Sequence, residues 1–120
     1  MKPCVLFVVL CLLTVSACDE DFQDCDVSDP MELSWFREMT DALGKNSLSE
    51  YMYVMQGDYK NKRVYISANC CPMCNSVVIV YDCSGNQLGY LGHGEDHIAP
   101  EAITNQSIAW KSSSNVCAFM

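Results

Sequence analysis

Basic residues are scarce in this sequence, which holds seven Lys and Arg residues against fifteen Asp and Glu residues and has a net charge of −8. The bases are scattered along the chain and form no basic stripe. A protein that binds nucleic acid needs such a stripe to neutralise phosphates. We therefore exclude nucleic acid as a partner.

Long apolar runs are lacking too. The longest one, residues 4–15, is shorter than the roughly 20 residues that span a bilayer. Lys2 before it and small residues after it are typical of a secretory signal peptide. The segment Val15-Ser16-Ala17-Cys18 matches a bacterial lipobox, in which the cysteine takes a diacylglycerol and becomes the new N-terminus. We expect a lipoprotein signal peptide over residues 1–17 and a membrane anchor through a lipid on Cys18.

Ordinary signal-peptidase cleavage after Ala17 is the alternative, because Val15 and Ala17 also satisfy its small-residue rule. Cysteine parity favours the lipoprotein. Of nine cysteines, Cys4 and Cys11 leave with the signal peptide, and acylation of Cys18 leaves an even number that can oxidise completely after export. The disulfide candidates are then Cys25, Cys70, Cys71, Cys74, Cys83 and Cys117.

Negative charge concentrates directly after Cys18. Seven acids and no base lie from Asp19 to Glu32, a charge of −7, whereas residues 33–120 have eight acids and six bases, a net of −2. A run of like charges stays extended and solvated, so residues 18–28 are expected to be a lipid-anchored acidic tether.

Acids directly after the lipid-bearing cysteine resemble the surface-export signal of Bacteroidota lipoproteins. A plain solvated spacer is one alternative, and retention in the inner membrane, as an Asp in the second position implies in enterobacteria, is another. The expected location is the bacterial cell envelope, at the outer membrane, with surface exposure left open.

Residues 29–120 are predicted to form one small domain, near the size at which disulfides are needed to support the core. Asp29 is placed as a helix N-cap, Pro30 suits the first helical position, and Glu32 could complete a capping box. Gly44 is predicted to end the helix. Apolar residues recur three and four positions apart and give the helix one apolar face, formed by Leu33, Phe36, Met39 and Leu43.

After the helix, β-branched and aromatic residues predict strands. The segment 77–81 is apolar on both faces, which indicates a central strand, and 56–62 is predicted to be a hairpin loop. The expected fold is α+β, with one N-terminal amphipathic helix packed on a small antiparallel sheet of four to five strands, stabilised by disulfides. The expected strands are 51–55, 63–67, 77–81, 87–91 and 107–111.

Several short motifs occur in a recognisable order. They are Tyr51-Met52-Tyr53, Val64-Tyr65-Ile66, Cys70-Cys71, Val80-Tyr81-Asp82 with Gly85-Asn86, and Ile108-Ala109-Trp110-Lys111. Over roughly residues 33–112 the chain resembles a domain-of-unknown-function family of small Bacteroidota lipoproteins. It departs from that pattern at 89–94, which lacks a cysteine often present there. The resemblance implies an envelope location and a fold, and it implies no activity.

Cys71-Pro72-Met73-Cys74 has the spacing of a thiol–disulfide exchange site and is similar to the active-site spacing of glutaredoxins. Such a site needs its first cysteine at a helix N-terminus, where the helix dipole lowers the thiol pKa. Here Asn75-Ser76 and a predicted strand follow instead. Structural bridging is the expected role, and an envelope thiol–disulfide redox protein that uses Cys71 and Cys74 is the alternative function.

The same two cysteines together with His93 and His97 nominally suffice for a tetrahedral zinc site. Exported thiols tend to oxidise rather than bind metal, so we predict no metal and no cofactor, and leave open whether the segment Gly92–His97, with its acids, binds one. No nucleophile–base motif such as Gly-x-Ser-x-Gly is present, so an enzyme is not expected.

Strand geometry limits the disulfide pairings. If residues 77–81 form one continuous strand, Cys74 and Cys83 lie beyond its opposite ends, up to roughly 30 Å apart, and cannot be bonded. A vicinal bond between Cys70 and Cys71 would be strained, so Cys74 should bond one of these two. The other vicinal cysteine then bonds either Cys25 or Cys117. Whichever of these two is left over bonds Cys83.

The sequence therefore predicts a binding or interaction module held at the envelope, with a protein, a glycan or another envelope or extracellular component as its partner. Trp35, Trp110 and the tyrosines could form an aromatic binding face, although half-buried packing is the commoner role of aromatic residues in strands. A eukaryotic secreted protein, with Asn105-Gln106-Ser107 as a glycosylation sequon, is a further alternative.

Overall fold

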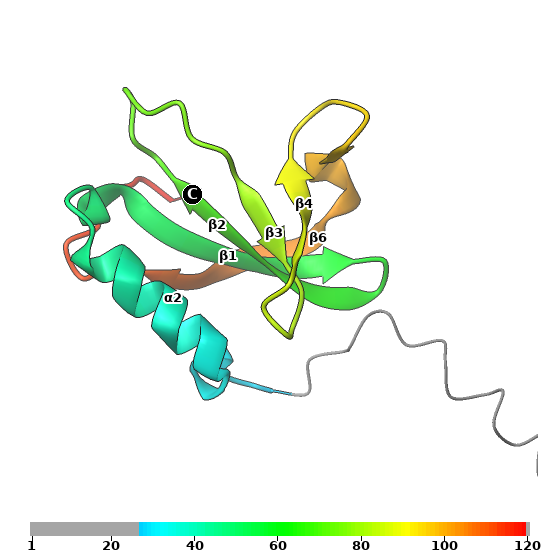
Figure 1. Cartoon of the computed structure of the whole chain (residues 1–120), viewed down its shortest axis with the longest axis horizontal. Helices are drawn as coiled ribbons and strands as arrows, with labels where there is room; N and C mark the ends of the chain where they lie inside the picture. The colour runs from blue at the N-terminus through cyan, green and yellow to red at the C-terminus, as the bar shows by residue number, and fades with distance from the viewer. Residues whose placement is uncertain (1–26, 120) are drawn as a thin grey trace, which may run out of the picture.

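A computed structural model of the chain describes residues 27–119 (Figure 1). The predicted signal peptide, the lipid site Cys18 and the disulfide candidate Cys25 lie outside the described residues. Within residues 27–119, no helix is long and apolar enough to cross a membrane. The helical elements are the 3₁₀ helices η2 (Pro30–Glu32), η3 (Ser49–Tyr51) and η4 (Pro100–Ala102), and the α-helix α2 (Ser34–Lys45).

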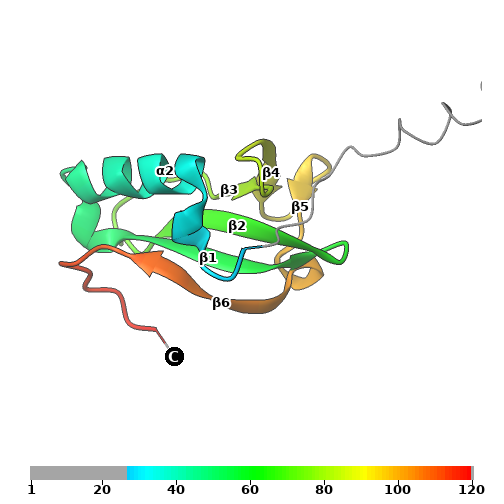
Figure 2. The same ribbon diagram turned by 90° about the horizontal axis from the view of Figure 1, so that it is seen from below.

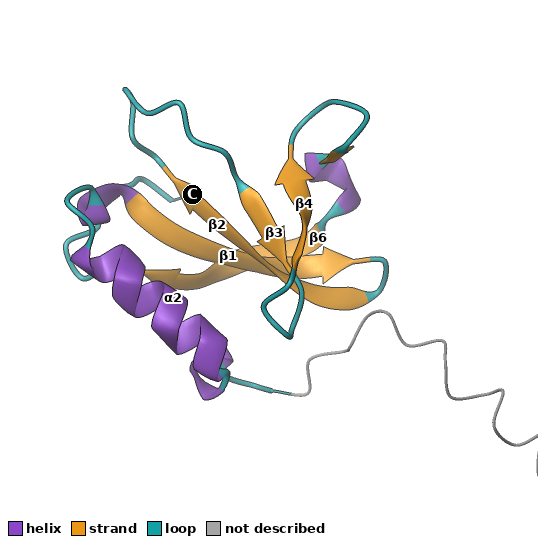
Figure 3. Ribbon diagram, viewed as in Figure 1, coloured by secondary structure: helices purple, strands orange, loops and turns teal. Residues whose placement is uncertain are grey.

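One six-stranded sheet carries α2 on one face (Figures 2 and 3). The strands are β1 (Met52–Tyr59), β2 (Lys62–Asn69), β3 (Ile79–Tyr81), β4 (Gln87–Leu91), β5 (His97–Ile98) and β6 (Thr104–Lys111). Their order is β5-β4-β3-β2-β1-β6, and all neighbours are antiparallel except β4 and β5. The α+β class is confirmed, whereas the expectation of four to five antiparallel strands is wrong, because β5 adds a short parallel edge.

The sheet coils strongly, because its two edge strands are also neighbours in sequence. Only residues 99–103 separate β5 from β6. A segment of that length spans at most about 20 Å, so the two edges of the sheet must approach each other. Ile98 and Ile103 are buried, and they pack with residues of the central strands on the face opposite the helix.

The predicted helix is divided into two parts. Asp29 caps the first, η2, by accepting a hydrogen bond from the Met31 N–H at 2.9 Å. Leu33 then adopts an extended conformation (φ −83°, ψ 121°), and α2 begins after it. The predicted stop at Gly44 followed by Lys45 is confirmed, since α2 ends at Lys45 and Gly44 is its penultimate residue.

The apolar face of α2 is the predicted one, and it packs on the sheet through a cluster centred on buried Phe36, Val54 and Tyr65. Trp35 attaches α2 to the segment that follows β3, because its indole Nε1 donates a hydrogen bond to the Cys83 carbonyl at 2.7 Å. The partly buried residues packed on this cluster include Leu33, Met39, Leu43 and Trp110.

The predicted central strand 77–81 is present but shorter, since β3 (Ile79–Tyr81) lies between β2 and β4 with Val80 fully buried on one face and Tyr81 against Trp35 on the other. The longer strand that is buried on both faces is β2. Val64 and Ile66 enter the second core, while Tyr65 between them faces the helix. Strand β3 begins only at residue 79, and Val77 is 63 % exposed. Val77 is apolar without being buried, because the β2–β3 ladder ends at the pair Ser67 and Ile79 and Val77 lies beyond that end.

The predicted hairpin loop 56–62 is mostly strand. The β1–β2 ladder continues to the pair Tyr59 and Lys62, so only Lys60 and Asn61 form the turn, with φ of 51° and 64°. Two positive φ values are typical of a type I′ hairpin turn.

Candidate functional site

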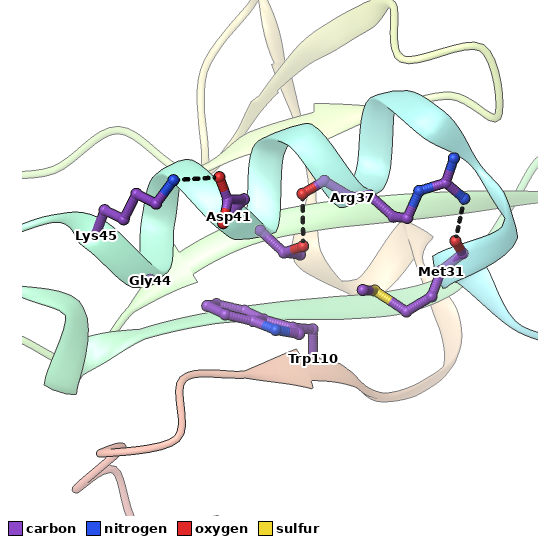
Figure 4. A pocket seen from close by; sticks show the side chains of 7 residues that line it. Met31, Arg37, Asp41, Gly44, Lys45 and Trp110 are labelled. Atoms are coloured by element: carbon purple, nitrogen blue, oxygen red, sulfur yellow. Dashed lines mark hydrogen bonds and ion pairs between the residues drawn. The ribbon is translucent and has the colours of Figure 1, made fainter.

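A shallow groove of about 590 Å³ lies between α2 and the edge strand β6 (Figure 4). Helix α2 forms one wall, the indole of Trp110 forms the floor, and Met31 closes one end. The lining side chains are mostly polar or charged. The full set is Met31, Arg37, Thr40, Asp41, Gly44, Lys45 and Trp110.

The helical repeat brings the wall residues together. Positions 37, 40, 41, 44 and 45 follow the three- and four-residue spacing that places side chains on one face of a helix. Trp110 pairs with Val54 in the β1–β6 ladder, and this register places the indole on the same side of the sheet as α2.

Gly44 keeps the space above the indole open. A Cβ atom at this position would lie 3.9 Å from Cζ2 of Trp110, which is an ordinary van der Waals distance. The glycine therefore meets no steric conflict that would exclude a side chain. A longer side chain here would extend over the indole and fill the groove.

The polar groups of the wall are held in place but have bonding capacity left. Arg37 donates from Nη1 to the Met31 carbonyl at 2.6 Å, and the Lys45 ammonium lies 2.7 Å from the Asp41 carboxylate. Thr40 donates its hydroxyl to the Arg37 carbonyl at 3.1 Å. Within the described part of the chain, the indole N–H of Trp110 donates no hydrogen bond, so it is available to a ligand.

The charge of the groove is opposite in sign to that of the protein. Arg37 and Lys45 contribute two positive charges and Asp41 one negative charge, which leaves a net of +1 on the lining residues. The whole chain carries −8. The lining residues therefore carry a small positive excess on an acidic protein.

The structure pairs four of the six predicted disulfide candidates. Cys71 is bonded to Cys74, and Cys70 is bonded to Cys117 with the Cα atoms 5.9 Å apart. Both pairs are among those expected from strand geometry. Cys83 is disulfide-bonded as well.

The loop that carries Cys71 and Cys74 does not supply the environment of a redox active site. No helix follows Cys74, since the chain continues without regular structure until β3 begins at Ile79. The loop is solvent-exposed, and Met73 between the two cysteines is 93 % exposed. A Cys71 thiolate would therefore gain no stabilisation from a helix dipole.

The nominal zinc ligands are not brought together. Among residues 27–119, no group of three or more His, Cys, Asp or Glu side chains is arranged to hold a metal ion. Cys71 and Cys74 are bonded to each other, His93 lies on the loop after β4, and His97 is the exposed first residue of β5.

The two tryptophans have different roles. Trp35 is a packing residue, with ring centroids of Tyr65 and Tyr81 at 5.7 and 5.8 Å. Trp110 also packs partly on the cluster around Phe36, and its indole lines the groove as well. Sequence reasoning singled out both tryptophans but missed the charged wall residues. The available signal for these residues was their common face of the helix, which they share with Gly44.

Comparisons with known proteins do not assign the chain to a family: a scan of protein-family models finds no match, and searches of curated proteins and of solved structures find none either. What the described residues define is a disulfide-bonded α+β domain with a positively charged, tryptophan-floored groove.

Proposed function

We propose that this protein is a lipid-anchored component of the bacterial envelope that acts by binding, and that its ligand occupies the groove between α2 and β6. The observation that carries the proposal is the Trp110 indole, which forms the floor of a groove that is also lined by the charged side chains Arg37, Asp41 and Lys45. A concave site with an aromatic surface and a few placed polar groups is the usual form of a ligand site.

The lining favours binding over catalysis. None of the seven lining residues is a His, Cys or Ser. The only hydroxyl, that of Thr40, is engaged with the helix backbone, and the only carboxylate, that of Asp41, is paired with Lys45. A nucleophile with an adjacent general base is therefore missing from this set.

The envelope location is supported by the lipobox at Val15–Cys18 and by the resemblance to small Bacteroidota lipoproteins. The acidic segment after Cys18 would serve as the tether between the lipid and the domain. Two or three acyl chains bury enough methylene groups to hold a small domain stably at a membrane.

The first test concerns the groove and needs no known ligand. Small probe molecules (phenol, acetate and glucose) are titrated into isotope-labelled protein, and we expect amide shifts to concentrate at Asp41, Gly44 and Trp110. Gly44→Leu should abolish these shifts, because its side chain would cover the indole. The variant should remain folded, since Leu is favoured over Gly in a helix by about 0.8 kcal/mol.

Ala42→Leu is the matched control, because it adds the same side chain at an exposed position of α2 outside the groove. It should leave the probe shifts unchanged. Shifts that gather elsewhere on the protein, or that persist in Gly44→Leu, would show that the groove is not the binding site.

The second test concerns the anchor. Intact protein extracted from membranes should carry a lipid mass on Cys18, and Cys18→Ser should remove both that mass and the partitioning into detergent. Recovery of the wild-type protein as an unlipidated soluble species that begins at Cys18 would contradict the proposal.

A thiol–disulfide redox function of Cys71 and Cys74 remains the alternative, because their loop is accessible to a protein thiol. A Cys71 thiol with a lowered pKa, in a bond that is reversibly reduced by glutathione, would favour this function over binding.

A further inference from the structure

We infer that the groove between α2 and β6 binds an acidic oligosaccharide, with one sugar ring on the Trp110 indole and ligand carboxylates at Arg37 and Lys45. The inference rests on the proposed function of the groove and adds the chemical class of the ligand. Three properties of the site lead to this class.

The first property is the polarity of the walls. Only Met31 and Trp110 contribute large apolar side chains, and Arg37, Thr40, Asp41 and Lys45 are polar or charged. A groove for an apolar helix of a partner protein presents a continuous apolar surface instead. The ligand that fits this lining therefore combines polar groups with an apolar face.

The second property is the flat floor. An indole ring packs well against another flat face, and a pyranose ring presents a face of C–H groups that can lie on it. The indole N–H of Trp110 donates no hydrogen bond within the described residues, so it can donate to a hydroxyl at the edge of the sugar. Gly44 leaves this part of the groove uncovered.

The third property is the placement of the charges. Arg37 and Lys45 are eight positions apart on one face of α2, which corresponds to about 12 Å along the helix axis. Figure 4 shows the two cations at opposite ends of the groove, with Asp41 between them. A disaccharide or trisaccharide covers this length, so carboxylates on its outer units can meet both cations.

Arg37 and Lys45 can each bind a ligand carboxylate without giving up an interaction that contributes much to the stability of the protein. Arg37 uses one N–H for the Met31 carbonyl, and its remaining donors can engage a carboxylate in a bidentate pair. The ion pair of Lys45 with Asp41 is solvent-exposed, with 75 % and 66 % of the two side chains accessible. Such pairs contribute little to stability, so Lys45 can be shared with a ligand. Asp41 can then accept a hydrogen bond from a sugar hydroxyl.

The test is isothermal titration calorimetry of the folded domain with trigalacturonate, neutral maltotriose and triglutamate at low ionic strength. Trigalacturonate should bind at least ~5-fold more tightly than maltotriose, which is the ratio that a single exposed carboxylate–cation contact of about 1 kcal/mol produces. Its affinity should fall as salt is added. Gly44→Leu should abolish binding.

Arg37→Gln and Lys45→Gln should each weaken trigalacturonate binding by about 2- to 5-fold, the effect of one lost exposed charge contact. Lys60→Gln removes a cation at the turn between β1 and β2, outside the groove, and should leave the affinity unchanged. Lys45→Gln is the safer charge variant, because Arg37 also holds the carbonyl of Met31.

Equal affinities for trigalacturonate and maltotriose would overturn the acidic class. If the binding of both sugars were nevertheless lost in Gly44→Leu, the groove would still be the binding site. Tighter binding of triglutamate would also overturn the inference, in favour of an acidic peptide. Absence of binding by all three probes would overturn it as well, while the titration with small probe molecules would decide separately whether the groove binds ligands at all.

Discussion

Cys70→Ser combined with Cys117→Ser should lower the free energy of unfolding by about 4 kcal/mol. The two cysteines are separated by 47 residues. In the chain-entropy account, a cross-link of this span removes about 4 kcal/mol of loop-closure freedom from the unfolded chain at 25 °C. Stabilities of small domains are roughly 5–15 kcal/mol, so the loss is a large part of the total. Urea denaturation of both proteins measures it.

The short disulfide provides the matched control. Cys71 and Cys74 are three residues apart, and the same relation gives about 1.6 kcal/mol for their double serine variant. Equal losses for the two double variants would contradict the loop-entropy explanation and would show that local packing determines the contribution of these bonds.

Loss of the long disulfide should also loosen the C-terminal segment. Its remaining attachments include three contacts: the Asn115 amide donates to the Met52 carbonyl at 2.9 Å, the Val116 N–H donates to the Glu50 carbonyl at 2.9 Å, and the Phe119 ring packs on that of Tyr53 with the centroids 5.0 Å apart. Amide hydrogen exchange should therefore accelerate over residues 112–119 before it does so in β1 or β2.

Features that depend on adjacent residues could be predicted from the sequence. The cap at Asp29 requires only the N–H of Met31 two residues later, and the apolar face around Phe36 follows from the helical repeat. Pairing of Cys71 with Cys74 was one of two options left by strand geometry. In each case, the determining interaction is local or is limited by a short chain segment.

Features that depend on distant contacts could not be predicted. Gly57 belongs to a strand although glycine disfavours strands, because a Cβ atom there would come within 2.6 Å of Cγ2 of Ile103. Strand β5 has two residues, and its burial of Ile98 depends on the coiling of the whole sheet. No pattern of neighbouring residues signals either contact.

The residues of the candidate site fall into the same two groups, those that the sequence identifies and those whose roles depend on distant contacts. Trp110 could be identified as a candidate because its residue type alone suggests a binding surface. The contributions of Arg37 and Lys45 depend on α2 lying beside β6, and that arrangement arises from the packing of the helix on β1 and β2. The groove is thus a consequence of helix docking.

Phe36→Ala should therefore remove the groove together with a large part of the stability. Phe36 is fully buried, and its ring lies 5.2 Å from that of Tyr65 and 5.8 Å from that of Trp35, measured between centroids. Truncation of a buried Phe to Ala costs about 3–5 kcal/mol, because the neighbouring side chains cannot close the cavity. Thermal unfolding should show a strongly lowered midpoint, and near-ultraviolet circular dichroism should show loss of the tryptophan signal.

Val77→Ala is the control, since Val77 is 63 % exposed and its truncation should change the stability by less than about 0.5 kcal/mol. A second measurement separates lost docking from general unfolding: at low temperature, where Phe36→Ala retains folded protein, the probe-molecule shifts at Gly44 and Trp110 should still be absent. Shifts of wild-type size would mean that the groove does not depend on Phe36. Retained stability would contradict the role of this ring as the main contact between α2 and the sheet, because no other side chain of the helix is fully buried against both Val54 and Tyr65 within the described residues.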